Sequence, residues 1–88
     1  MTYTIEFSNK AEKQFKSLPP ETQERLQPKI DALAQEPRPR GAIKLSGVEE
    51  DTYRIRVGDY RILYEISDRV LLVWVVEVGH RREVYRQR

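Results

Sequence analysis

The second half of this 88-residue chain carries an unusual set of cationic and titratable side chains. Residues 51–88 hold eight basic groups, all of them arginine, whereas five of the eight basic groups in residues 1–50 are lysine. A guanidinium is a planar, permanently charged fork that matches phosphate oxygens. The only histidine, His80, and Tyr85 can accept or release a proton. Together such groups could hold a phosphodiester and move protons on it, if the fold brings them to one surface.

A β-hairpin is the element that would position the first arginines. Two alternating runs, TYRIRV and YRILYEI in residues 52–66, flank a Gly-Asp pair and predict a tight primed turn. This register places Arg56 directly opposite Arg61, with Arg54 on the same face. Like charges facing each other destabilise a strand pair, so an anion bound between the guanidiniums would explain them. The alternative is an exposed face with three solvated arginines, neutralised by Glu65.

The other face of the hairpin is apolar and is expected to pack on helices. Its members are Tyr53, Ile55, Val57, Tyr60, Ile62 and Tyr64. Upstream, residues 3–7 alternate like a short strand, and Ser8 or Asn9 can cap a following helix. A second helix is predicted over about 20–36, with Pro28 expected to kink it or loosen one of its turns. The apolar stripes of the two helices are Ala11, Phe15 and Leu18, then Leu26, Ile30 and Leu33.

Residues 37–47 predict a loop with a short edge strand around 43–45. The run VLLVWVVEV, residues 70–78, is apolar at nearly every position and predicts a central strand covered on both faces, with Trp74 in the core and Gly79 at its end. The predicted fold class is α+β: two N-terminal helices in an antiparallel hairpin, packed on one face of a twisted, mainly antiparallel sheet of four or so strands. The length allows a single domain, residues 1–88.

Composition excludes several kinds of chemistry. The chain has no cysteine, and its single histidine has no carboxylates at ligand spacing, so no metal site is expected. Phosphate-binding glycine loops and a serine or cysteine nucleophile set are missing too. The start MTYTIEFSNK lacks the pattern of a signal peptide, and the longest apolar run is too short for a membrane-spanning helix. We expect a cytoplasmic protein that uses no cofactor and no membrane.

Several motifs together resemble the RelE branch of the RelE/ParE toxin superfamily. They are SNKAEKQFKSLPP, LSG, YRIRVGDYRILYEI and VGHRREVY, and they span essentially the whole chain. The resemblance implies a toxin of a type II toxin–antitoxin system that cleaves messenger RNA in the ribosomal A site without a metal. It implies two helices against a twisted antiparallel sheet. The implied partners are a RelB-like antitoxin, the ribosome and mRNA, and operator DNA for the antitoxin complex.

The resemblance also assigns roles to residues. Arg54, Arg56 and Arg61 would bind the scissile phosphate, and Arg81 would contact the phosphate or the leaving group. Tyr85 would stack on a base and is the candidate general base. The implied reaction is attack of a ribose 2′-hydroxyl on the adjacent phosphate, which gives a 2′,3′-cyclic phosphate and a 5′-hydroxyl. The best-known member has lysines at the first two positions; because an arginine pKa lies above about 12, these two arginines are expected to act electrostatically.

Two proton-transfer hypotheses stay open. Tyr85 could serve as the base if surrounding arginines lower its pKa. His80 titrates near neutrality, yet the family pattern gives its position no settled catalytic role. The candidate RNA contacts are Arg82 and Arg86, together with Lys10, Lys13 and Lys16. The three lysines lie at i, i+3 and i+6, which fits a contact to ribosomal RNA and a solvated helix face equally well.

Two other functions fit the same fold. One is a ParE-like inhibitor of DNA gyrase, which would need neither the arginine trio nor Tyr85. The other is a non-catalytic RNA-binding module or a decayed toxin, and the intact YRIRVGDYR and HRREVY motifs argue against decay. The sequence therefore favours the endoribonuclease.

Overall fold

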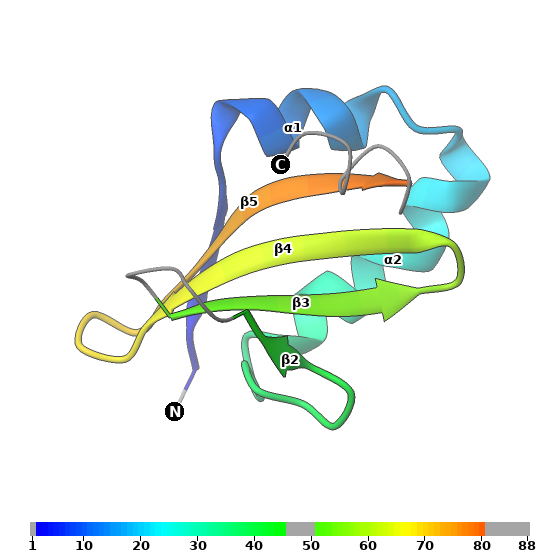
Figure 1. Cartoon of the computed structure of the whole chain (residues 1–88). Helices are drawn as coiled ribbons and strands as arrows, with labels where there is room; N and C mark the ends of the chain where they lie inside the picture. Colours follow the sequence, from blue (N-terminus) through cyan, green and yellow to red (C-terminus); the bar gives the residue numbers. More distant parts are fainter. Residues whose placement is uncertain (1, 46–50, 81–88) are drawn as a thin grey trace.

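The computed structural model describes residues 2–45 and 51–80, which form two helices and a five-stranded sheet (Figure 1). Along the chain the elements are β1 (Thr4–Phe7), α1 (Asn9–Lys16), α2 (Pro20–Ala32), β2 (Ile43–Lys44), β3 (Thr52–Val57), β4 (Tyr60–Ser67) and β5 (Leu72–His80). The strand order is β1-β5-β4-β3-β2. Only β1 pairs in parallel, with β5; the other described pairs are antiparallel. The predicted α+β class is confirmed, and the parallel β1 makes the sheet mixed.

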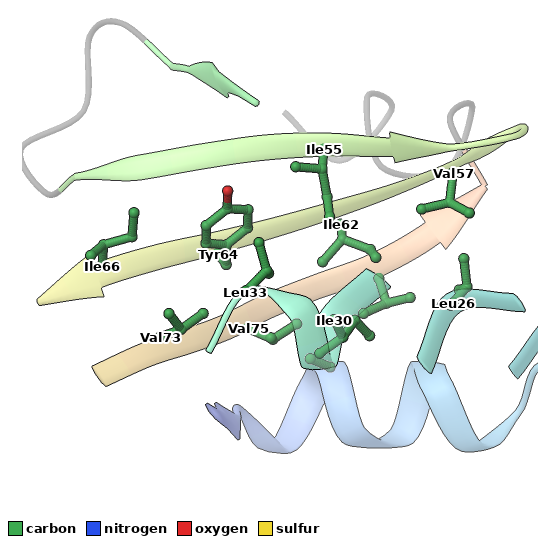
Figure 2. Packing of buried hydrophobic residues seen from close by; sticks show 12 residues of the cluster. Leu26, Ile30, Leu33, Ile55, Val57, Ile62, Tyr64, Ile66, Val73 and Val75 are labelled. Carbon is green, nitrogen blue, oxygen red and sulfur yellow. The ribbon is translucent and has the colours of Figure 1, made fainter. Parts of the chain in front are cut away.

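The helices form where the capping and apolar patterns predict them. Ser8 caps α1, because its Oγ accepts a hydrogen bond from the backbone N–H of Ala11 at 3.0 Å. The α2 stripe, formed by Leu26 and Ile30 of the helix and by Leu33 at its C-cap, is buried against the sheet (Figure 2). The second helix ends at Ala32 instead of 36, because the next residues continue as turns, and it runs through Pro28. Figure 1 shows α2 behind the sheet, running back from the end of α1.

The first helix completes an edge of the sheet. β1 pairs only with residues 72–75, and α1 lies along the rest of β5 (Figure 1). There the Ser8 hydroxyl donates to the Val76 carbonyl at 3.1 Å, and the Gln14 Oε1 accepts from the Val78 N–H at 2.8 Å. Unpaired edge groups would invite other strands, so these side chains substitute for a neighbouring strand. They allow β5 to extend beyond its pairing with β1.

A β-bulge in β5 shifts the phase of its side chains. Leu63 of β4 pairs with Glu77, but the next residue, Tyr64, pairs with Val75, which leaves Val76 as the extra residue. Before the bulge, every second residue of β5 points into the core. After the bulge, the same alternation resumes one position later along the strand. A strand can therefore be apolar at nearly every position while only one of its faces is fully covered.

This phase shift corrects two expectations. Trp74 lies on the face away from the helices and is 40% exposed, so its predicted core position was wrong. The strand begins at Leu72 and continues to His80. Gly79 is a buried residue inside the strand and does not end it. Within residues 2–45 and 51–80 the buried side chains form one core, in which the inward residues of β3, β4 and β5 pack against the α2 stripe (Figure 2).

Arg38 holds the loop after α2 against the end of the sheet that carries the β4–β5 turn. Its guanidinium donates to Asp68 at 2.9 Å and to the Tyr53 hydroxyl at 3.0 Å, and lies 5.4 Å from the centre of the Tyr53 ring. The Tyr3 hydroxyl donates to the same carboxylate at 2.5 Å. Hydrogen bonds from Arg38 and Tyr3 hold the pKa of the Asp68 carboxyl below its usual value. The clamp joins four parts of the chain that are distant in sequence: Tyr3, Arg38, Tyr53 and Asp68.

A buried tyrosine fixes the same loop from the inside. Tyr64 is fully buried, and its hydroxyl donates to the Pro37 carbonyl at 2.7 Å. Burial raises the pKa of Tyr64 well above its usual value. A buried Tyr64 hydroxyl and Pro37 carbonyl without a partner would cost free energy. This hydrogen bond therefore determines where the chain leaves α2 toward β2.

Candidate functional site

The hairpin has the predicted register. Arg56 pairs with Arg61, Ile55 pairs with Ile62, and Arg54 pairs with Leu63. Residues directly opposite each other point to the same side, with Cβ atoms about 4.5–5.5 Å apart. Since the isoleucines point into the core, the three arginines emerge on the other side of the sheet. We call this surface, formed by Arg54, Arg56 and Arg61, the arginine face.

The turn that sets this register requires glycine. Gly58 has φ of +62°, a conformation that β-carbon-bearing residues rarely adopt. A Cβ at this position would also lie 2.5 Å from the Nη2 of Arg25, which reaches the turn from α2. A positive φ at the first turn residue only is typical of a type II′ hairpin turn. The two-residue turn leaves Arg56 and Arg61 no alternative but to face each other.

The arginines differ in accessibility. Arg61 is 4% exposed, Arg54 is half-buried and Arg56 is exposed. On its other side Arg61 pairs with Gly79 of β5, a residue with no side chain. Burial fixes Arg61 in one place, and exposure leaves Arg56 free to adjust to a ligand.

On the outer face of the sheet, basic residues lie near the hairpin turn and acidic residues lie further along the strands. The arginines lie toward the hairpin turn, whereas Glu65 and Glu6 flank Trp74 further along. Glu65 is four residues from Arg61, about 13 Å along the strand. The Glu77 carboxylate, between these regions, pairs with the Lys10 ammonium at 3.3 Å. An anion approaching this face is therefore drawn to the turn end, where Arg56 and Arg61 lie.

His80 occupies the opposite side of β5 from the arginine face. It pairs with Tyr60, and the two rings lie 5.8 Å apart at 76° in an edge-to-face arrangement. Tyr60 packs against the core, and Gly79, not His80, stands beside Arg61. The other C-terminal candidates, Arg81, Arg82, Tyr85 and Arg86, lie outside the described residues, and their roles stay predictions.

The three helix lysines lie on α1, which packs beside β5 (Figure 1). β5 is the neighbour of β4, which carries Arg61, and lies two strands from β3, which carries Arg54 and Arg56. Lys10 pairs with Glu77 across to the sheet, and Lys16 pairs with Glu12 on its own helix at 3.3 Å. Lys13 is exposed. Their predicted contact to RNA stays a prediction.

The structure also contains a groove that sequence reasoning missed. It lies between the end of α2, the following loop and the β2–β3 edge, with a volume of about 490 Å³. Its lining residues are Lys29, Ala32, Leu33, Pro39, Arg40, Gly41, Ile43, Ile55 and Arg56. We call it the cationic groove. The PRPRG stretch predicts only a loop, and nothing in its local pattern shows that it faces α2 and β3.

Residues 2–45 and 51–80 hold neither a cluster of metal-binding side chains nor a helix suited to a bilayer. In these ranges no three histidine, aspartate or glutamate side chains come together as a metal site would require. Neither of the two helices there has the length and apolar character needed to cross a bilayer.

Known proteins resemble this chain over nearly its full length. The family model described as ParE toxin of type II toxin-antitoxin system, parDE, matches residues 5–85. The mRNA interferase toxin RelE of Escherichia coli K12 is 33% identical over 91 aligned residues, 99% of this chain and 94% of that protein. Toxin RelG of Mycobacterium tuberculosis is 32% identical over 99% of this chain and all of its own length.

Solved structures agree with these sequence matches. A chain in the crystal structure of the archaeal RelE–RelB complex from Pyrococcus horikoshii OT3 is similar in fold, with a TM-score of 0.80. The two chains are 33% identical, and the similarity covers 92% of this chain and 97% of that chain.

Proposed function

This chain belongs to the RelE branch of the RelE/ParE superfamily of type II toxin–antitoxin toxins, and on that premise we propose that it is a ribosome-dependent endoribonuclease. In this proposal the toxin cleaves messenger RNA in the ribosomal A site without a metal cofactor and so stops translation in the cytoplasm. Names of relatives such as mRNA interferase support a nuclease activity.

The observation that carries the proposal is the pairing of Arg56 with Arg61, beside Arg54, on one face of the hairpin. Attack of the ribose 2′-oxygen on phosphorus gives a phosphorane with an additional negative charge. Guanidiniums held in advance around that charge stabilise the transition state more than the ground state. The P–O5′ bond then breaks, which leaves a 2′,3′-cyclic phosphate and a 5′-hydroxyl.

Two protons must move during this reaction. The 2′-hydroxyl loses one to a base, and the departing 5′-oxygen gains one. Arginines stay protonated at neutral pH and are poor candidates for either transfer. We assign the base to Tyr85 and contact with the phosphate or the leaving group to Arg81, as the family resemblance implies. His80 is the weaker candidate, because its strand register places it with Tyr60 on the other side of the sheet.

The proposed partners follow from the same membership. A RelB-like antitoxin would inhibit the toxin, and the pair would bind operator DNA. Complexes named RelE–RelB among the structural relatives support the antitoxin partner. The ribosome would supply alignment of the mRNA, since three arginines on a sheet face do not by themselves orient a ribose hydroxyl for in-line attack.

The test uses purified toxin and ribosomes that hold a defined codon in the A site. Primer extension maps the cut, and end-labelling identifies the termini. We expect A-site cleavage with a 2′,3′-cyclic phosphate and a 5′-hydroxyl, and little cleavage of the same mRNA without ribosomes. Tyr85→Phe should abolish most of the activity, whereas His80→Ala should retain it. Equal cleavage of naked mRNA, or 5′-phosphate products, would contradict the mechanism.

A second candidate is inhibition of DNA gyrase, because the matching family model is described as a ParE toxin. A supercoiling assay with purified gyrase separates the two functions. Gyrase inhibition that is insensitive to Arg56→Gln and Tyr85→Phe, with no cleavage on ribosomes, would establish the second candidate. A non-catalytic RNA-binding module would score negative in both assays and positive only in RNA binding.

A further inference from the structure

The cationic groove combines an aliphatic floor with a rim of positive charge. Leu33 and Ile55 are buried at its base, and Ile43 is 47% exposed at its mouth. Lys29 and Arg40 lie on the rim, and none of the described lining residues is acidic. Its volume of about 490 Å³ lies within the usual range of ligand pockets, about 300–1,000 Å³. The Arg38 clamp and the Tyr64 hydrogen bond hold the loop that forms its outer wall.

This chemistry favours a peptide over a nucleotide. Nucleobases are recognised by stacking on aromatic rings and by hydrogen bonds to their edges. The described lining has no aromatic residue, and its polar side chains are all cations. Aliphatic side chains flanked by carboxylates would instead match both the floor and the rim.

We propose that the cationic groove binds an acidic, amphipathic segment of the antitoxin, whose aliphatic side chains fill the groove while its carboxylates meet Lys29, Arg40 and Arg56. This inference rests on the proposed function, because it takes the antitoxin as the partner. It adds where the antitoxin segment binds and how binding in the groove affects the arginine face.

The link to activity is Arg56, which belongs to both surfaces. It lines the groove, and it pairs with Arg61 on the arginine face. This dual position exists because β2 pairs only with Tyr53 and Arg54, so that β3 has no described outer neighbour at Arg56. A carboxylate that binds Arg56 from the groove withdraws its charge from the arginine face. Inhibition then begins at the groove, without the partner covering Arg54 or Arg61.

The first test measures the affinity between the purified toxin and the small polypeptide encoded beside its gene. Ile43→Glu places a carboxylate where those of the partner would lie. Val70→Glu is the matched control, since Val70 is 66% exposed in the turn before β5. We expect at least tenfold weaker binding for Ile43→Glu and a change within twofold for Val70→Glu. Urea unfolding of both variants verifies that the exposed positions tolerate the change.

The second test compares arginine reactivity in the free toxin and in the complex, by phenylglyoxal modification and peptide mass mapping. We expect the antitoxin to protect both Arg40 and Arg56, while Arg69, exposed in the β4–β5 turn, stays reactive. If Arg40 is protected while Arg56 stays fully reactive, the proposed link between the cationic groove and the arginine face is wrong.

The outcomes separate this inference from the proposed function. If the polypeptide binds wild type, Ile43→Glu and Val70→Glu equally, the groove is not its site, although the toxin–antitoxin assignment stands. If Ile43→Glu instead weakens binding of a single-stranded RNA oligonucleotide and leaves antitoxin binding intact, the groove is an RNA site. If wild type neither binds the polypeptide nor cleaves mRNA, both proposals fail.

Discussion

Replacing Arg56 by glutamine should separate stability from activity. Glutamine removes the charge and keeps a polar side chain of similar reach at an exposed strand position. If Arg56 and Arg61 face each other to hold an anion, the variant should fold at least as well as the parent and cleave RNA far more slowly.

The expected magnitudes follow from the pairing. Two guanidiniums about 6 Å apart repel by roughly 0.7 kcal/mol at a dielectric constant of 80 and by roughly 3 kcal/mol at 20. Because Arg56 is exposed and salt screens the repulsion, we expect the free energy of unfolding to rise by about 0–1 kcal/mol. Loss of one charged donor to a transition-state oxyanion costs about 10²–10³ in rate, and we expect that reduction in cleavage.

The assay has two parts. Urea unfolding, followed by circular dichroism, gives the free energy of unfolding of the parent, Arg56→Gln and the control Arg69→Gln. Single-turnover cleavage on A-site-programmed ribosomes gives the rate. Arg69→Gln makes the same charge change in the β4–β5 turn, at the other end of the hairpin, and should keep the parental rate within about threefold.

Two results would refute this reasoning. Cleavage by Arg56→Gln at the parental rate would mean that the charge does not act on the phosphate. A fall of more than about 1 kcal/mol in the free energy of unfolding would mean that the arginine pair stabilises the sheet, so that lower activity could reflect lost folding.

Three further predictions concern the elements that position the site, each measured by urea unfolding. Hydrogen bonds from Arg38 depress the pKa of Asp68. The ionised Asp68 carboxylate therefore contributes fully to stability above the usual aspartate pKa, and this contribution is lost as the pH falls through the depressed value. Below about pH 4, wild type should lose stability more steeply than Asp68→Asn. Gly58→Ala should cost about 1–2 kcal/mol, and adding Arg25→Ala should recover the steric part but not the cost of the positive φ, whereas full recovery would contradict the backbone argument. Tyr64→Phe should cost about 1–3 kcal/mol, since it leaves a buried carbonyl without its hydrogen bond; a neutral change would show that water replaces the hydroxyl.

The sequence by itself determined the features that depend on neighbours along the chain. The turn at Gly58 and the alternation around it predicted the pairing of Arg56 with Arg61, which the structure confirms. The cap at Ser8 and the stripe of α2 followed in the same way from local geometry. Such features are predictable because a two-residue turn fixes the register, and side-chain directions then repeat with the period of the strand or helix.

Only the tertiary structure decided the features that depend on contacts between distant segments. The bulge at Val76 exposes Trp74 and sets His80 beside Tyr60, and the strand sequence alone does not reveal it. The cationic groove likewise exists because the loop carrying Arg40 folds against α2 and β3. Register and burial in these places depend on what another segment supplies: hydrogen bonds from α1 to the edge of β5, and the Arg38 clamp on the loop. A periodic pattern read along one segment contains no information about such partners.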